Sequence, residues 1–534
     1  MSSAKSSPPP EQGSFIWTRR LILFAFWGVV VVLGLPHWLW TTSIHRSQLP
    51  LESMNNWADG KVCRLQYPIH VKLRYEDAGF DETNALAAET QHVLNALNQL
   101  PLYQFHITGD LANASSEQAL LPSHVRDTLA SRENSLIVNI QNDKKIKTPQ
   151  AALKSLIPVL DVRHNPARTG DSLTAFLARE ISKVFSHEQN YMHHLLQETP
   201  FESKEYVNRF SPEVKAGLDA RTTRAFKYAS TYHLTFSLFV ASSSPSAWNI
   251  QQALEDGIYP LIERLSPVNR FTIDTQIQLY ASFSPSIAGP QYNPITREWQ
   301  LQRPDLSGFI NAAEWPLSPS IGSGPTINFV LYVPSKHQSP LVLAETGGQS
   351  WIVPQWGGVQ IFNPADKQVD QLTAEDLRPA MLTFADQLST LVGLPPSPSS
   401  LSLRISGLTR ERTTSLILSA SSTLGALSRL TLKLTSIAIP DSVAKSVSET
   451  IHRLDQACQH MQDGRYLSAL ENARTAEEEA EKAFFEPSMV GQVYFPEEHK
   501  VAVYVPLLGP MAVPLVLSAI KELKKLRERK VKVA

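Results

Sequence analysis

The sequence predicts a mixed α/β domain with a C-terminal helical hairpin, flanked by one transmembrane helix at each end. Three observations support this fold class. An uncharged apolar stretch lies near each end of the chain, strand-like and helix-like periodicities alternate between the two stretches, and a narrow apolar stripe with helical spacing follows Asp441. One large folded region between two membrane anchors is therefore expected.

The two apolar stretches are residues 21–40 and 501–520, each of 20 residues without Asp, Glu, Lys or Arg. A helix of this length spans about 30 Å, the thickness of the hydrocarbon core of a bilayer. The basic segment before the first stretch is compatible with a cleaved signal peptide, but the bulky Trp38 and Trp40 stand where a cleavage site requires small residues. We therefore predict that the first stretch is retained as a signal anchor.

Charge predicts the orientation of the chain. The 20 residues before the first stretch carry a net charge of +2 and the 14 residues after the second carry +5, whereas the whole chain carries −1, which leaves −8 for the residues between. The positive-inside rule places both tails in the cytosol. The acidic middle is then lumenal or extracellular, and its charge gives no basis for nucleic-acid binding.

The second stretch contains Pro506, Pro510 and Pro514, whose spacing of four places them on one side of a helix. Each proline removes a backbone donor and leaves a carbonyl that lipid cannot satisfy. Two interpretations stay open. The stretch is either an ordinary kinked span, or its proline side packs against partner helices that cover the exposed backbone.

Between the stretches, alternation of apolar and polar residues predicts strands, and a period near 3.6 predicts helices. Strands are expected at 69–75, 104–108, 135–140, 232–240, 271–283, 326–333 and 341–344, and helices at 81–100, 172–188 and 247–265. This alternation is typical of a mixed α/β layer. From 443 to 461 apolar residues recur every three or four positions, and Gly464 separates them from a second helix that ends before Pro487. These two helices form the predicted hairpin.

Motifs of known chemistry are missing from the sequence. It has no G-x-S-x-G, H-E-x-x-H or C-x-x-C motif, no P-loop and no G-x-G-x-x-G. His187, His193 and His194, with Glu188, are the nearest approach to a metal site, but His187 and His194 are about two helical turns apart, too far for a pair of ligands on one straight helix. We therefore predict a solvated polar face there, and no catalytic, cofactor-binding or metal-binding residues.

Two small features bear on the compartment. Asn113 begins the only glycosylation sequon without a central proline, and it falls in the region predicted to be lumenal. Cys63 and Cys458 are the only cysteines, so no disulfide framework exists, and one long-range bridge or two free thiols are both possible.

One loop is unusual in composition. It contains Trp351, Pro354, Trp356, Gly357 and Gly358 within eight positions. Glycines in such a setting allow a backbone approach that a side chain would block, with aromatic faces held nearby. The loop is either a packed hairpin corner or a recognition surface for a partner.

These segments carry a family resemblance. The exit of the first stretch, Leu33–Pro50, has the pattern Leu-Pro-x-Trp-x-x-Thr-Thr-x-x-x-Arg-x-x-Leu-Pro. Further similarity covers 232–240, 271–280, 328–334 and the Pro-x-Trp-Gly-Gly loop, and it ends with Phe484–Ser518, prolines included. In these blocks the chain resembles PIG-S, the phosphatidylinositol-glycan class S subunit of the GPI transamidase.

The resemblance implies a two-span protein of the endoplasmic reticulum membrane that is a non-catalytic subunit of the complex attaching preassembled GPI anchors to proproteins. Its partners would be other transamidase subunits, among them a cysteine-protease-like catalytic subunit. A stand-alone membrane-anchored lumenal hydrolase or transferase, and a lumenal adaptor unrelated to GPI anchors, are the alternatives. Neither alternative function requires the Trp-Gly-Gly loop or the C-terminal block of similarity, so these two features count against both alternatives.

The predicted organisation runs in order along the chain. It comprises a cytosolic tail (1–20), a transmembrane helix (21–40), a lumenal domain (41–500, with an N-terminal α/β part at 41–230, a central α/β part at 231–400 and a C-terminal part with the hairpin at 401–500), a second transmembrane helix (501–520) and a basic cytosolic tail (521–534).

Overall fold

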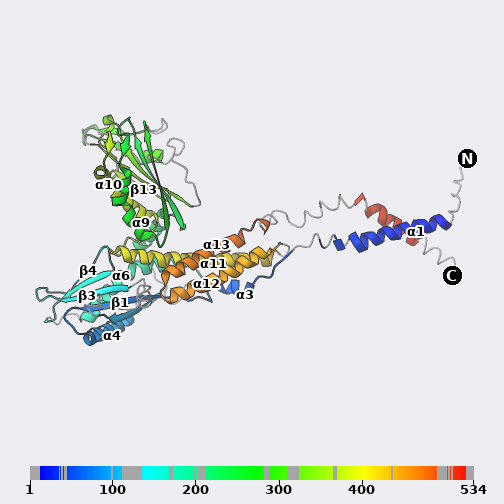
Figure 1. The fold of residues 1–534 in the computed structure, drawn as a ribbon, viewed down its shortest axis with the longest axis horizontal. Helices are drawn as coiled ribbons and strands as arrows, with labels where there is room; N and C mark the ends of the chain where they lie inside the picture. Colours follow the sequence, from blue (N-terminus) through cyan, green and yellow to red (C-terminus); the bar gives the residue numbers. More distant parts are fainter. Residues whose placement is uncertain are drawn as a thin grey trace. The chain divides into compact units, whose positions relative to one another are not determined.

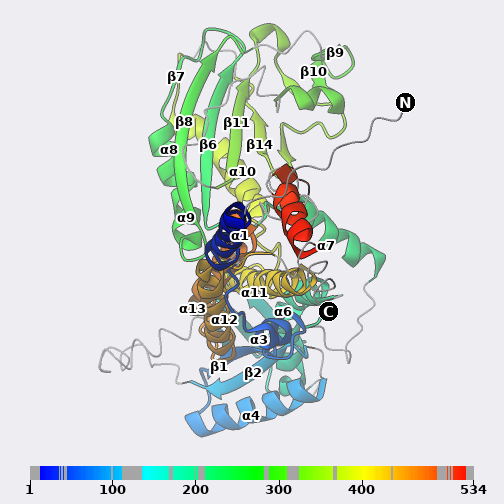
Figure 2. The ribbon, with the colours of Figure 1, turned by 90° about the vertical axis from the view of Figure 1, so that its right-hand side faces the viewer.

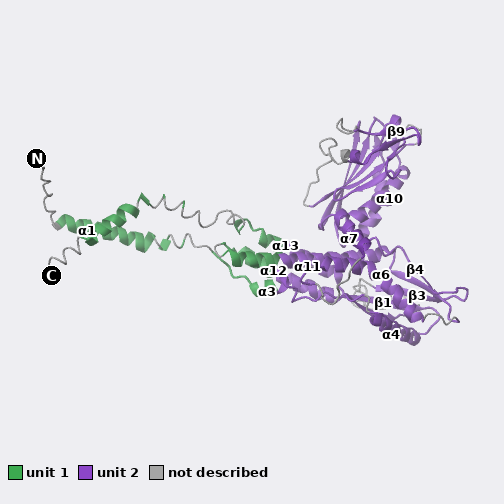
Figure 3. Ribbon diagram, turned by 180° about the vertical axis from the view of Figure 1, so that it is seen from behind, with its two compact units in different colours: residues 1–55, 423–449, 479–534 green, residues 56–422, 450–478 purple. Residues whose placement is uncertain are grey.

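The computed structural model describes most of the chain. The described residues exclude 1–12, 35, 38–39, 41–44, 98–99, 111–134, 168–171, 198, 202–210, 282–287, 310–323, 365–369, 435–436, 490–501, 503–505, 507–508, 511 and 525–534. They form two compact units (Figure 3). Unit 1 comprises residues 1–55, 423–449 and 479–534, and unit 2 comprises residues 56–422 and 450–478.

Unit 2 contains a first sheet of five strands in the order β2-β1-β3-β5-β4, all parallel except β4. Its strands are β1 (Tyr67–Tyr75), β2 (Tyr103–Gly109), β3 (Ser135–Asn142), β4 (Gln150–Leu153) and β5 (Val159–His164). Alternate residues of β1, from Tyr67 to Leu73, are buried. Helices α4 (Phe80–Leu97) and α6 (Leu173–Leu196) contact each other, and α4 lies along β1 and β2 (Figure 1).

The second sheet of unit 2 has the order β13-β14-β11-β6-β8 (Figure 2). Its strands are β6 (Thr231–Val240), β8 (Arg270–Leu279), β11 (Thr326–Val333), β13 (Ser350–Val353) and β14 (Gly357–Ile361). β6 and β11 are buried along nearly their whole length, as expected for parallel strands covered on both faces. On one face Phe384 packs against Phe236 and Phe329, and on the other an apolar cluster contains Phe239 and Val330.

Shorter elements complete this α/β region. They are α7 (Pro212–Arg224), α8 (Ile250–Gly257), α9 (Tyr259–Leu265), α10 (Ala374–Leu391), η3 (Arg303–Phe309), η4 (Lys336–Gln338), the pair β7 (Ala247–Trp248) and β15 (Gln371–Leu372), and the small sheet of β9 (Gln291–Asn293), β10 (Glu298–Leu301) and β12 (Leu341–Leu343). The predicted helix at 247–265 is thus replaced by β7 and two short helices, with Pro260 in the first turn of α9. The predicted mixed α/β class is confirmed.

Three long helices follow in the C-terminal part. They are α11 (Leu401–Lys433), α12 (Asp441–Gln462) and α13 (Tyr466–Phe484). α12 and α13 occupy the segments predicted for the hairpin, and Gly464 between them has φ of +76°, a conformation that favours glycine. No helix was predicted at 401–433, where the structure places the longest one of the described residues.

Unit 1 contains the apolar N-terminal helix. α1 (Gly13–Gly28) continues into η1 (Val29–Gly34), and residues 14–34 are long and apolar enough to cross a membrane. Within the described residues no second helix meets the same criteria, although residues 512–524 are helical. The unit also contains α3 (Leu51–Ala58) up to its residue 55.

Candidate functional site

The tryptophan-rich segment forms a β-hairpin. β13 and β14 pair antiparallel, with Trp351 opposite Val359, and Gln355 at the turn has φ of 55°. Trp351 and Trp356 are partly buried against the apolar cluster that contains Val359, whereas Pro354 and Gln355 are exposed. The hairpin therefore uses its tryptophans for packing, while its tip lies in solvent.

The two glycines allow the hairpin to approach its neighbours closely. A Cβ atom on Gly357 would lie 1.8 Å from the carbonyl oxygen of Asn328 in β11, and one on Gly358 would lie 1.9 Å from Oε1 of Gln387 in α10. The Nε2 group of Gln387 donates a hydrogen bond of 3.2 Å to the Trp351 carbonyl. Residues 351–358, which the sequence singled out, are thus brought together by contacts with β11 and α10.

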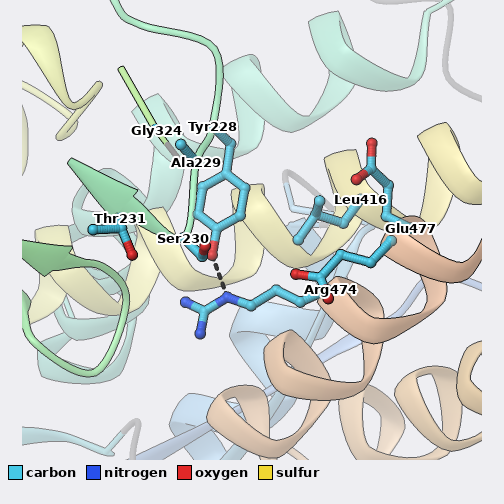
Figure 4. A pocket seen from close by; sticks show the side chains of 9 residues that line it. Tyr228, Ala229, Ser230, Thr231, Gly324, Leu416, Arg474 and Glu477 are labelled. Atoms are coloured by element: carbon cyan, nitrogen blue, oxygen red, sulfur yellow. Dashed lines mark hydrogen bonds between the residues drawn. The ribbon is translucent and has the colours of Figure 1, made fainter. Parts of the chain in front are cut away.

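Unit 2 also has a polar cavity of about 220 Å³ (Figure 4). It is lined by Tyr228, Ala229, Ser230, Thr231, Gly324, Leu416, Arg474, Glu477 and Glu478. Figure 4 shows the Arg474 side chain extending to the Tyr228 hydroxyl. None of these residues was singled out by the sequence, because they come from segments far apart in the chain and match no local motif.

Three polar side chains of this cavity, those of Tyr228, Arg474 and Glu477, make hydrogen bonds with each other or with neighbouring residues. Arg474 donates hydrogen bonds to the Tyr228 hydroxyl and to the Val268 carbonyl, and Ser419 Oγ donates to Glu477 at 3.1 Å. Burial raises the pKa of Tyr228, although the positive charge of Arg474 opposes this effect, so the phenol is protonated at neutral pH. The described lining contains no histidine or cysteine. The cavity is suited to holding a small polar group rather than to activating a nucleophile.

Two ion pairs, one buried and one partly buried, connect α11 to α6 and α7. Arg410, 1 % exposed, donates two hydrogen bonds to Glu188 of α6, at 2.6 and 2.7 Å. The next residue, Glu411, accepts from Arg221 of α7 at 2.5 and 3.1 Å, and the Arg221 guanidinium lies 4.0 Å from the centre of the Tyr191 ring. The sequence marks the α11 charges, since the three consecutive charged residues 410–412 interrupt the otherwise uncharged stretch 405–428. It does not indicate the distant residues with which they pair.

The histidines weighed as metal ligands lie on α6. The prediction of a solvated polar face is wrong for Glu188, which is buried because it pairs with Arg410. His187 is exposed, and His194 is partly buried with its Nε2 atom 3.5 Å from Asp219 Oδ1. In the part of the chain that the structure describes, no three His, Cys, Asp or Glu side chains are grouped as metal ligands would be.

Cys63 and Cys458 form a disulfide, which joins the segment before β1 to α12 across a sequence separation of 395 residues. Their Cα atoms are 6.0 Å apart, within the usual range for a bridge. Of the two possibilities that the sequence left open, the structure has the bridge, and both cysteines are buried.

The apolar ends of the chain meet in unit 1. Arg19 Nη2 lies 2.5 Å from Glu522 Oε1, and Arg20 Nε lies 3.0 Å from Glu522 Oε2. These residues immediately precede the first apolar stretch and follow the second. The ion pairs therefore join the N-terminal end of the first stretch to the C-terminal end of the second.

Arg46, which belongs to the pattern at 33–50 that follows the first stretch, caps a helix within unit 1. It donates hydrogen bonds to the carbonyls of Leu434 and Thr431, both at 3.0 Å. These carbonyls belong to the end of α11, where backbone acceptors lack partners inside the helix and a positive charge is favourable. The backbones of Arg46 and Ile439 also form an isolated parallel β-bridge.

The remaining predicted sites are not brought together with these groups. Asn113 lies outside the described residues. Pro506, Pro510 and Pro514 are exposed in unit 1, and the role predicted for them stays a prediction.

Comparison with known proteins gives a consistent result. The family model described as phosphatidylinositol-glycan biosynthesis class S protein, PIG-S, matches residues 25–529. The chain is 27 % identical to the human GPI-anchor transamidase component PIGS, with 94 % of each chain covered. It is 29 % identical to the Schizosaccharomyces pombe GPI transamidase component PIG-S homolog, over 96 % of this chain and 85 % of that one. It is 25 % identical to the Saccharomyces cerevisiae GPI transamidase component GPI17, over 92 % of this chain and 90 % of that one.

Proposed function

Because this chain belongs to the PIG-S family, we propose that it is a subunit of the GPI transamidase complex and supports the attachment of preassembled GPI anchors to proprotein C-termini. The observation that carries this proposal is the similarity to transamidase components over nearly the whole chain in mammals and in two yeasts. The other subunits of that complex, including a cysteine-protease-like catalytic subunit, are then its partners.

We propose further that the subunit is non-catalytic. A cysteine nucleophile acts as a thiolate, and the only two cysteines of the chain are joined in a disulfide. The sequence contains no motif of serine or metal hydrolases. The buried charged groups on α11 are each engaged by an opposite charge. These observations support a bracing role for the domain rather than a role in bond cleavage.

The membrane arrangement is also a proposal: two spans, both tails cytosolic and the large domain in the lumen of the endoplasmic reticulum. The pairing of Arg19 and Arg20 with Glu522 supports it, because two helices that cross a bilayer in opposite directions would bring these residues to the same side. The disulfide supports it as well, because disulfides persist in oxidising compartments such as this lumen.

The function is tested by depleting this protein in cells that express a reporter proprotein with a GPI-attachment signal. We expect uncleaved proprotein and complete GPI lipid to accumulate together, because the transfer step fails while lipid synthesis continues. Re-expression of the chain should restore anchoring. Normal anchoring of the reporter after complete depletion would contradict the proposal.

The topology is tested in the same cells with added glycosylation sequons. Sequons attached before residue 1 and after residue 534 should stay unmodified, whereas the natural one at Asn113 should be modified and lost in an Asn113→Gln variant. Modification of either tail would overturn the two-span arrangement.

A further inference from the structure

We propose that the outer edge of β8 is a strand-addition site, occupied by an extended segment of another subunit of the transamidase complex. This inference rests on the proposed function and adds to it a defined contact surface and the kind of partner that fits it. β8 ends the strand order of the second sheet (Figure 2).

The geometry of β8 leaves one row of backbone groups open. It pairs in parallel with β6 over ten consecutive residue pairs, from Thr231–Arg270 to Val240–Leu279. The Arg270 N–H donates to the Ser230 carbonyl, so the N–H groups of even-numbered residues point toward β6. The odd-numbered residues present their N–H and C=O groups outward. They are Phe271, Ile273, Thr275, Ile277 and Leu279.

No strand among the described residues pairs with this outer row. Every residue of β8 is at least partly exposed, including Ile277 at 39 %. The row extends over ten residues, about 33 Å at about 3.3 Å per residue. Only an extended backbone offers donors and acceptors at the matching spacing, so the chemistry of this edge selects a β-strand as its occupant.

Another edge strand of unit 2, β2, is covered by side chains, in contrast to β8. At the edge strand β2, side chains of α4 occupy outward N–H groups. Gln91 Oε1 accepts from Ile107 N at 2.9 Å, and Asn84 Oδ1 accepts from Gly109 N at 3.0 Å. The edge strands β4 and β13 have only four residues each. β8 is both long and without such covering side chains in the described part of the chain.

β8 also lacks the usual protections of an open edge. It contains no proline, its register shows no bulge, and its charges are limited to Arg270 and Asp274. A long, regular edge of this kind promotes pairing with other chains unless it is covered. Permanent cover by a neighbouring subunit removes this hazard, whereas a proprotein that leaves after each turnover would expose the edge again. This argument favours a stable subunit as the occupant.

The test uses proline at an outward position. In Thr275→Pro the lost N–H is one that β6 does not use, so the sheet is retained, while the missing donor and the ring obstruct an added strand. The matched control is Thr275→Val, which keeps the N–H and favours a strand. In purifications through this full-length subunit, we expect recovery of the other subunits to fall at least about tenfold in Thr275→Pro, a loss of about 1.4 kcal/mol or more in association, and to be unchanged in Thr275→Val.

Hydrogen exchange gives a second readout that does not depend on how well the variant folds. In the wild-type complex the outward amides within residues 271–279 should exchange more slowly than in the isolated full-length chain. Equal exchange in both would overturn the inference. Protection that appears only with added proprotein, or that rises with the concentration of the isolated chain, would also overturn it and identify a substrate or a second copy as the occupant. If Thr275→Pro retains both its partners and reporter anchoring, this inference fails while the proposed function stands.

Discussion

Arg410 and Glu411 are adjacent residues of opposite charge that bind different helices. Arg410 reaches Glu188 on α6, and Glu411 reaches Arg221 on α7. A buried charge is costly unless it is paired and hydrogen-bonded. A shift of α11 by one position would bring like charges together, either Glu411 opposite Glu188 and Arg412 opposite Arg221, or Arg410 opposite Arg221. These residues therefore specify how α11 is placed against α6 and α7.

Replacing Glu188 by glutamine tests this role. The substitution keeps the shape of the side chain but leaves the Arg410 guanidinium buried without a counter-charge, so we expect the free energy of unfolding to fall by about 3–5 kcal/mol. The measurement is denaturant unfolding of the purified protein. The exposed pair Arg465–Asp463 provides the control, because Asp463→Asn should change stability by at most about 1 kcal/mol. Similar effects of the two substitutions would refute the argument.

At the scale of elements, the hairpin β13–β14 depends on the lack of a side chain at Gly358. In Gly358→Ala the new methyl would overlap Gln387 Oε1, and we expect a loss of about 1–3 kcal/mol in the free energy of unfolding. Adding Gln387→Ala should recover part of this loss, because it removes the obstructing atoms. The control is Gly217→Ala in α7, where nothing lies within 4 Å and alanine should be neutral or stabilising by up to about 1 kcal/mol. No recovery in the double variant would contradict the packing explanation.

Elements differ in how well the sequence predicts them. β6 and β11 were predicted because their apolar runs match their burial, and α12 because its stripe faces a core. α11 was not predicted, because its buried side includes Thr409, Thr413 and Thr414 beside Arg410. Their hydroxyls donate to carbonyls one turn earlier. In sequence such satisfied polar residues look the same as exposed ones, so the apolar stripe is confined to the second half of the helix, at Leu416, Ile417, Ala420, Leu424 and Leu427.

The sites also differ in how well the sequence predicts them. The hairpin at 351–358 is visible in sequence because its aromatic residues and glycines are local. The polar cavity is not visible in the sequence, because Tyr228, Gly324 and Arg474 are brought together only by the fold. The same holds for the ion pairs of α11, whose partners are about 200 residues away. Sequence patterns report local periodicity, and they carry no information on which distant charges meet.

At the scale of the whole molecule, the Cys63–Cys458 bridge links distant parts of unit 2. Cross-links that close long loops restrict the unfolded chain, and removal of a native disulfide typically costs about 2–5 kcal/mol. We expect Cys63→Ser, Cys458→Ser and the double variant to lose the same amount, because each removes the same bond. Unfolding under non-reducing conditions measures this. A double variant that loses clearly more than either single one would show that the thiols contribute separately.

We propose that the proline-bearing stretch near the C-terminus packs against helices of partner subunits within the membrane. Three prolines at intervals of four leave backbone carbonyls that lipid cannot satisfy, so a partner helix that covers this side would gain interactions unavailable to lipid. Changing Pro506, Pro510 and Pro514 to leucine restores the missing donors and raises helix propensity. We expect membrane insertion, measured by resistance to carbonate extraction, to stay intact while recovery of the other transamidase subunits falls several-fold.

The control for this prediction keeps the prolines and changes neighbouring apolar residues. Val513→Leu with Val516→Leu alters exposed side chains of the same helical segment and should leave both insertion and subunit recovery unchanged. If the leucine variant of the three prolines recovers its partners as well as the wild type does, the prolines merely bend the span, and the contacts that hold this subunit in the complex must be sought in the lumenal domain.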